Sequence, residues 1–287
     1  MKKFISGIIL AALSLTPFFA DAAVLKPKRP EPKLSISQDS DTGQLVVSWT
    51  GKGILKKASA PNGQFRPVKI RGNKSQYVIE PADTGTEVYR LDTTRGDIFS
   101  FNIVGYVNLR LPPGLSLIQN PLSFPTNTVA FWWPNAPDGS QILKYVPNNG
   151  YEVSTFDGIS RTWSNPDLEI PMGQGFYFRN SSSETIMNTF VGEVRQGFLT
   201  NALPAGYSMK GSLVPQTGSI NSVHGIPGEP GDEIRTLTND SGIETVNIST
   251  FDGVLNQWFP DLILHVGEGF WVHKQNQQDW VRFFSAN

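Results

Sequence analysis

The sequence predicts an all-β protein in which a small N-terminal β-sandwich precedes two homologous antiparallel β-repeats. Three observations support this prediction. The 27 Gly and 21 Pro residues favour tight turns, short alternating apolar segments lie between turn clusters, and one set of motifs appears twice in the same order. Beyond the first residues, no long segment has a convincing 3.6-residue apolar period. We expect the repeats to be barrel-like or sandwich-like, with a pseudo-two-fold relation between them.

The N-terminus has the residue order of a cleavable secretory signal. A basic start at residues 1–3 precedes an apolar run at residues 4–19 and a small-x-small end at residues 20–22. We expect cleavage after Ala22. The mature protein would then be secreted, to the extracellular space, the cell surface or the periplasm. The run is shorter than the about 20 residues of a membrane helix, and no later stretch approaches that length, so we expect no membrane span in the mature chain.

Residues 23–33 are rich in Pro and Lys and are predicted to form a linker, because alternate prolines exclude helix and favour an extended chain. Residues 34–96 are predicted to form the N-terminal sandwich, because turn clusters separate short apolar segments there. The apolar residues of these segments are Leu34, Ile36, Leu45, Val47, Trp49, Tyr77, Val78, Ile79, Val88, Tyr89 and Leu91. This part of the chain resembles the compact fibronectin-III-like or immunoglobulin-like modules of secreted bacterial proteins.

Residues 97–190 and 191–287 are predicted to be the two β-repeats. Four landmarks recur in them with nearly the same spacing, so chance is a poor explanation. They are Val-Gly-x-Val (104–107 and 191–194), Leu-Pro-x-Gly-x-Ser (111–116 and 203–208), Ser-Thr-Phe-Asp-Gly (154–158 and 249–253) and Gly-x-Gly-Phe-aromatic (173–177 and 267–271).

This tandem unit resembles a group of secreted, repeat-built β proteins of environmental bacteria that have no assigned activity. The resemblance is carried by the Leu-Pro-x-Gly-x-Ser, Pro-Asp-Gly and Gly-x-Gly-Phe-aromatic landmarks and covers about two-thirds of the chain. It implies the fold and the export, and it transfers no catalytic residue.

The repeated Ser-Thr-Phe-Asp-Gly motif predicts two hairpins. Asp157-Gly158 and Asp252-Gly253 each follow an alternating segment, and Asp-Gly is the typical centre of a type I′ turn because both of its central positions need a positive φ. In each hairpin, we expect the phenylalanine before the turn and the tryptophan after it (Trp163 or Trp258) to share one face and set the register.

The same motif also permits a catalytic interpretation. Asp157 and Asp252 would then be the carboxylate pair of a glycoside hydrolase, with Trp163 and Trp258 as sugar platforms. Such a pair must lie about 5 to 9 Å apart. A structural turn explains both aspartates without that requirement.

Tryptophans provide the candidate binding residues: Trp132, Trp133, Trp163, Trp258 and Trp271. Trp132 and Trp133 are adjacent, and neighbouring residues of a strand point to opposite faces, so we expect one of them to be exposed. An exposed aromatic ring stacks on a sugar ring or forms a contact surface.

The composition excludes several kinds of site. The net charge of −1 argues against a nucleic-acid or anionic-membrane partner, because both select basic surfaces. The chain has no cysteine, and its three histidines (His224, His265 and His273) lack a spacing typical of zinc sites. It has no phosphate-binding glycine loop and no dinucleotide motif. We therefore expect no metal and no cofactor.

Together, these features predict an exported, non-catalytic structural protein of the cell surface or matrix that acts through binding or assembly. Its partners would be further copies of itself or an extracellular polysaccharide. A carbohydrate-binding module is the alternative, and a glycoside hydrolase is the second alternative.

Overall fold

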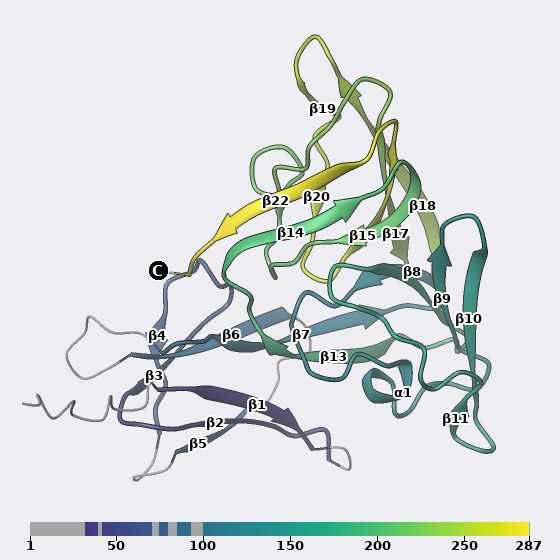
Figure 1. The fold of residues 1–287 in the computed structure, drawn as a ribbon. Coiled ribbons are helices and arrows are strands. Elements are labelled where there is room, and N and C mark those ends of the chain that lie inside the picture. Colours follow the sequence, from purple (N-terminus) through teal and green to yellow (C-terminus); the bar gives the residue numbers. More distant parts are fainter. Residues whose placement is uncertain (1–31, 40–41, 71–74, 80–84, 93–99, 287) are drawn as a thin grey trace, which may run out of the picture. The chain divides into compact units, whose positions relative to one another are not determined.

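The computed structural model describes residues 32–39, 42–70, 75–79, 85–92 and 100–286 (Figure 1). The predicted signal peptide and its cleavage site lie outside these residues, as does the predicted linker except for Pro32 and Lys33. The described chain is all-β, as predicted: its strands form antiparallel sheets, and one short helix, α1 (Val129–Trp132), accompanies them. Within the described part, every sheet is open. The search of the described residues for a helix with the length and hydropathy of a membrane span finds none.

The N-terminal strands form two sheets that pack on each other. The first sheet contains β1 (Leu34–Gln38), β2 (Leu45–Trp49) and β5 (Gln76–Ile79), and the second has the order β13 (Ile186–Glu193), β7 (Val104–Leu111), β6 (Gly85–Asp92), β3 (Ile54–Ala58) and β4 (Arg66–Pro67). Strands of residues 34–96 therefore share a sheet with β7, which lies in the predicted first repeat, and with β13, which crosses the predicted boundary between the two repeats. Leu34, Val47, Tyr89, Tyr106 and Val191 are buried in one apolar cluster across these two sheets.

The two Val-Gly-x-Val segments are partners in this sheet. Gly105 faces Gly192 and Tyr106 faces Val191 in the antiparallel register of β7 and β13. The first segment begins β7, and the second takes up the end of β13 and the residue after it.

Two further sheets have the same strand order. One is β11 (Thr162–Trp163), β10 (Gly150–Asp157), β9 (Gln141–Val146), β12 (Gly175–Asn180) and β8 (Gly114–Gln119); the other is β19 (Gln257–Phe259), β18 (Ile243–Asp252), β17 (Glu233–Asp240), β21 (Gly269–Lys274) and β15 (Gly206–Gly211). We call them the first and second five-stranded sheets, and strands at the same place in each are matched strands. The registers also agree: β9 and β12 pair Ile142 with Phe178, and β17 and β21 pair Ile234 with Val272.

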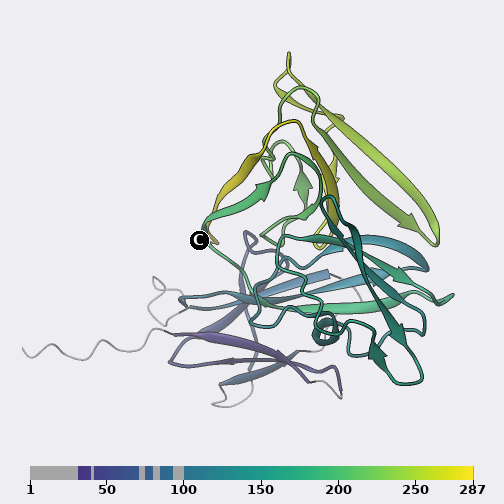
Figure 2. The same ribbon diagram turned by 45° about the vertical axis from the view of Figure 1, so that its right-hand side comes forward.

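Two small sheets complete the fold. One pairs β14 (Gly197–Leu203) with β22 (Gln278–Phe284), and the other pairs β16 (Gly218–Ser219) with β20 (Ile263–Leu264). Figures 1 and 2 show β14 and β22 side by side, before and after the second five-stranded sheet in chain order. In chain order, β7 and β13 likewise precede and follow the first five-stranded sheet.

The Ser-Thr-Phe-Asp-Gly segments lie in two hairpins. Their register agrees with the prediction, but their turns do not. Phe156 faces Trp163 and Phe251 faces Trp258, with ring centroids 5.3 and 5.4 Å apart. The prediction of a type I′ turn is wrong. The loop is longer than two residues, and its positive φ falls at Arg161 (55°) in the first hairpin.

Close packing explains the glycines of these hairpins. A Cβ atom at Gly158 would lie 2.8 Å from the Cβ of Asp138, and one at Gly253 would lie 2.5 Å from the Cγ of Pro230. The glycines are therefore required by a neighbouring loop that approaches closely, and the positive φ falls elsewhere.

The two five-stranded sheets meet through reciprocal contacts. Gln119 donates its backbone N–H to the carbonyl of Gly267 (2.9 Å), and the matched Gly211 donates to the carbonyl of Gly173 (3.0 Å). A Cβ at Gly175 would lie 2.7 Å from the carbonyl oxygen of Lys210, and the matched Gly269 stands in the same relation to Ile118 (2.8 Å). The Gly-x-Gly landmark thus marks the place where two backbones approach too closely for any side chain.

We expect Gly175→Ala and Gly269→Ala each to lower the free energy of unfolding by at least about 2 kcal/mol, because the backbone they meet cannot relax as a side chain does. Gly150→Ala is the control: its φ is +83° but nothing lies within 4 Å of an added Cβ, so a cost of about 1 kcal/mol is expected from backbone strain alone. Urea unfolding measures all three. Equal small losses would contradict the close backbone contact.

Candidate functional site

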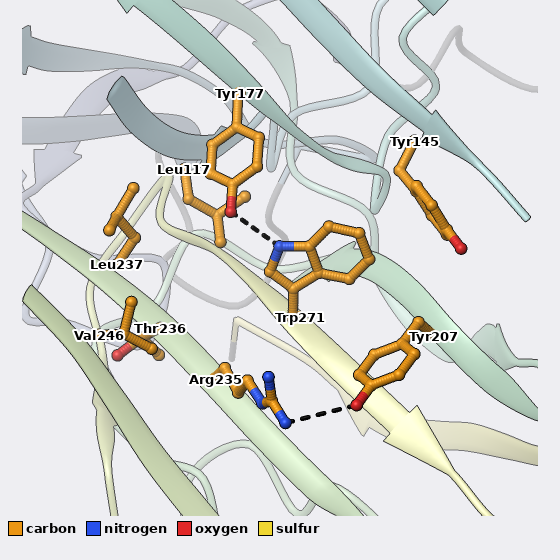
Figure 3. A pocket seen from close by; sticks show the side chains of 9 residues that line it. All are labelled: Leu117, Tyr145, Tyr177, Tyr207, Arg235, Thr236, Leu237, Val246 and Trp271. Carbon is orange, nitrogen blue, oxygen red and sulfur yellow. Dashed lines mark hydrogen bonds between the residues drawn. The ribbon is translucent and has the colours of Figure 1, made fainter. Parts of the chain in front are cut away.

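An aromatic cleft of about 380 Å³ lies between the two five-stranded sheets (Figure 3). Both sheets contribute to it. The first supplies Leu117, Tyr145 and Tyr177, and the second supplies Tyr207, Arg235, Thr236, Leu237, Val246 and Trp271.

Strand alternation directs these side chains into the cleft. In β12, Phe176 and Phe178 are buried in the core of the first sheet, so Tyr177 between them points to the opposite face. In β21, Phe270 and Val272 are buried in the same way, and Trp271 points outward. The aromatic residue that ends the Gly-x-Gly-Phe-aromatic landmark is therefore the cleft residue in both sheets.

Trp271 and Tyr177, which occupy matched positions, meet at the centre of the cleft. The indole Nε1–H of Trp271 donates to the hydroxyl of Tyr177 at 2.8 Å (Figure 3). Tyr145 lies edge-on to Trp271 with ring centroids 4.7 Å apart, and Tyr207 flanks it at 6.2 Å. Tyr151 continues the row of rings, 5.6 Å from Tyr145.

Arg235 adds a polar side to the cleft. Its Nη2 donates to the hydroxyl of Tyr207 at 3.3 Å, and its guanidinium lies 5.5 Å from the centre of that ring. Glu233 pairs with Arg235 at 2.5 Å and raises the pKa of the guanidinium. The positive charge of the cleft is therefore matched by a negative charge beside it.

The two hydrogen-bonded phenols can still act as donors. Burial raises the pKa of Tyr177, and this effect exceeds the opposing effect of the hydrogen bond from Trp271. The hydroxyls of Tyr177 and Tyr207 accept from Trp271 and Arg235, so each keeps its own hydrogen for a ligand. The cleft thus offers aromatic faces, two hydroxyl donors and a paired guanidinium.

Four of the five tryptophans predicted as binding residues are buried. Trp132, Trp133, Trp163 and Trp258 are at most 4% exposed, and Trp271 alone among the five is partly exposed. The indole nitrogens of Trp163 and Trp258 donate to the carbonyls of Trp133 (2.7 Å) and Ile226 (2.8 Å). These hydrogen bonds hold the two rings inside their own sheets' cores.

The expectation that Trp132 or Trp133 is exposed is wrong. Both lie at the end of α1, so the strand rule of opposite faces does not apply to them. Trp132 packs against Phe190 at 5.1 Å, and Trp133 stacks on Phe178 at 5.5 Å.

Asp157 and Asp252 are each bound by their own turn. Asp157 Oδ1 accepts hydrogen bonds from the backbone N–H groups of Ile159 (2.8 Å) and Ser160 (3.1 Å). Both bonds lower the pKa of the carboxyl, the Ser160 bond more than the Ile159 bond. Asp252 accepts the corresponding two bonds, from Val254 and Leu255. The β11 and β19 ends of the two sheets, which carry these turns, lie at opposite ends in Figures 1 and 2. The structure does not bring the two carboxylates together.

The three histidines do not meet either. His224 is buried, His265 is exposed, and His273 lies 4.4 Å from the ring of Tyr207 beside the cleft. Within the described ranges, no group of three His, Cys, Asp or Glu side chains is placed to hold a metal ion.

Sequence reasoning missed Tyr145, Tyr177, Tyr207 and Arg235. The sequence does contain a signal for Tyr177: it stands between Phe176 and Phe178 in a strand, so it points to the face opposite to theirs. The other three are brought to the cleft by the contact between the sheets. Comparison with protein-family models, curated proteins and solved structures finds no match to this chain.

Proposed function

We propose that this protein is an exported, non-catalytic binding protein and that its aromatic cleft holds a neutral polysaccharide. The single observation that carries the proposal is the cluster of partly exposed rings around Trp271, assembled from both five-stranded sheets. Aromatic faces stack on the apolar faces of sugar rings, and the phenol hydroxyls suit the sugar hydroxyls.

The charge of the cleft favours a neutral ligand. Arg235 is paired with Glu233, so an anionic sugar gains little from the guanidinium and meets a carboxylate beside it. The volume of about 380 Å³ is near the small end of the ~300 to ~1,000 Å³ usual for small-molecule sites, which fits a short stretch of a longer chain.

The chemistry of the lining favours binding over catalysis. The nine described residues that line the cleft include no carboxylate, histidine or serine, so they offer no acid–base pair for hydrolysis. We further propose that the two five-stranded sheets derive from one duplicated unit. The shared strand order, shared registers and reciprocal contacts support this duplication.

The proposal predicts that Trp271→Ala weakens binding of the protein to a neutral polysaccharide at least about 5-fold, if a sugar ring stacks on the indole as strongly as a nucleic-acid base does, at about 1 to 3 kcal/mol. Binding is measured by pelleting with insoluble glycans and by titration with soluble ones. Phe259→Ala is the matched control: it removes a ring that is 64% exposed and outside the cleft, and it should leave binding unchanged. Equal binding by the wild type and Trp271→Ala would contradict the proposed site.

A second candidate function is structural, as a component of a cell surface or extracellular matrix. The exposed apolar side chains on β14 and β22 support it, because such surfaces commonly mediate contacts between proteins.

A further inference from the structure

The strand pair β14–β22 exposes three large apolar side chains on one face. Phe198 is 81% exposed, Phe283 is 65% exposed and Val281 is 54% exposed. Phe198 and Phe283 face each other in the register, with ring centroids 5.1 Å apart. Three such side chains together on one two-stranded sheet form a contiguous apolar patch, which we call the β14–β22 face.

The corresponding face of β7–β13 is covered. Tyr106 stands five residues before the leucine that ends β7, and Phe198 stands five residues before the leucine that ends β14. Tyr106 pairs with Val191 just as Phe198 pairs with Phe283, yet Tyr106 and Val191 are each only 1% exposed.

A β-layer provides this cover. The sheet of β1, β2 and β5 packs over β7 and β13, with Leu34 and Ile36 buried in the same cluster as Tyr106 and Val191. In addition, β6 pairs with the second edge of β7, whereas within the described residues β14 pairs only with β22. The chain thus contains its own example of what fits such a face, namely the apolar side of another β-sheet.

We propose that the β14–β22 face is the interface of a two-fold dimer, in which two copies of this chain pack face to face. The outward residues at the centre of the face carry no charge, so two copies meet without repulsion there. The only charged outward residue of the two strands is Asp279, which pairs with Ala202 at the end of β14. Arg195 is exposed just before β14, at the opposite end of the pair.

These charges favour a two-fold axis that crosses the strands over one that runs along them. When two faces stack with their strands antiparallel, Asp279 of each copy lies toward Arg195 of the other, whereas a parallel arrangement would bring like charges together. Two-fold dimers are also the commonest symmetric assemblies. The apolar centre is small compared with the ~1,600 Å² buried in a standard interface, so the dimer should be weak and depend on concentration.

Sedimentation velocity of the full chain, from about 5 to about 500 µM, tests this proposal, because a weak dimer changes its occupancy over such a range. The wild type should shift from monomer to dimer. Phe198→Ser/Phe283→Ser should raise the dissociation constant at least about 10-fold, as expected when aromatic anchors of an interface are removed. Because both rings are exposed, circular dichroism should show an unchanged fold.

The control variant is Ile159→Ser/Val254→Ser. It removes two side chains that are 96% and 94% exposed at hairpin turns outside the face, and it should dimerise like the wild type. Asp279→Arg should weaken the dimer, and Arg195→Asp/Asp279→Arg should restore it. A wild type that stays monomeric throughout, or a dimer that Phe198→Ser/Phe283→Ser leaves unchanged, would overturn the proposal.

Discussion

Lys274→Met is expected to lower the free energy of unfolding by about 3 to 5 kcal/mol, because it leaves a buried carboxylate without its cation. The side chains of Lys274 and Asp232 are both fully buried and form an ion pair. Lys274 Nζ also donates to the carbonyl of Pro227 (3.1 Å) and to Gln278 Oε1 (2.6 Å). Urea unfolding at neutral pH measures the loss.

The first five-stranded sheet supplies the rescue variant. Asn180 ends β12 as Lys274 ends β21, and Ser140 precedes β9 as Asp232 precedes β17; both are buried and uncharged. The double variant Lys274→Asn/Asp232→Ser places these two residues in the second five-stranded sheet. It should recover more than half of the stability lost in Lys274→Met, because no buried charge remains. A cost below about 1 kcal/mol for Lys274→Met would contradict an ion pair shielded from water.

Acidification is expected to destabilise the protein through His224. Burial, assisted by the charge of Arg282, lowers the pKa of His224 to about 4 from its ordinary value of 6.5. The side chain is 1% exposed, and its Nδ1 lies 3.4 Å from Arg282 Nη1. The unfolded chain therefore binds a proton at a pH where the folded chain does not.

This difference in proton binding makes the folded protein less stable as the pH falls. The stability that the neutral His224 contributes is present above pH 6.5 and is lost as the pH falls toward 4, by about 3 kcal/mol in total. Urea unfolding at several pH values should show a loss of stability over this range. His224→Gln should remove most of that loss, and His265→Gln, at an exposed histidine, should leave most of it in place. The same loss in His224→Gln and the wild type would rule out His224 as its origin.

Local pattern predicted much of the fold. Alternation and turn clusters indicate the strands that became β1, β2, β5 and β6, and the Phe-to-Trp spacing sets the register of both hairpins. These features depend on residues close in sequence. The turn type failed because a distant loop, around Asp138 in the first hairpin, determines why glycine is needed there.

Exposure was less predictable, because it depends on what covers each face. Tyr106 and Phe198 are aromatic residues at corresponding places in similar strands, but a β-layer covers one and leaves the other exposed. The aromatic cleft was missed for the same reason. Tyr145 and Arg235 belong to different sheets, and only the contact between those sheets places them in one site.

The most direct test of the proposed binding site is an ¹H–¹⁵N spectrum of the indole N–H groups during titration with a neutral polysaccharide. The chain has seven tryptophans, and within the described structure Trp271 is the only one whose indole lines the cleft. We predict that the Trp271 resonance shifts with ligand while those of the buried Trp132, Trp133, Trp163 and Trp258 stay in place. No shift with any neutral glycan, or shifts that spare Trp271, would contradict carbohydrate binding in this cleft.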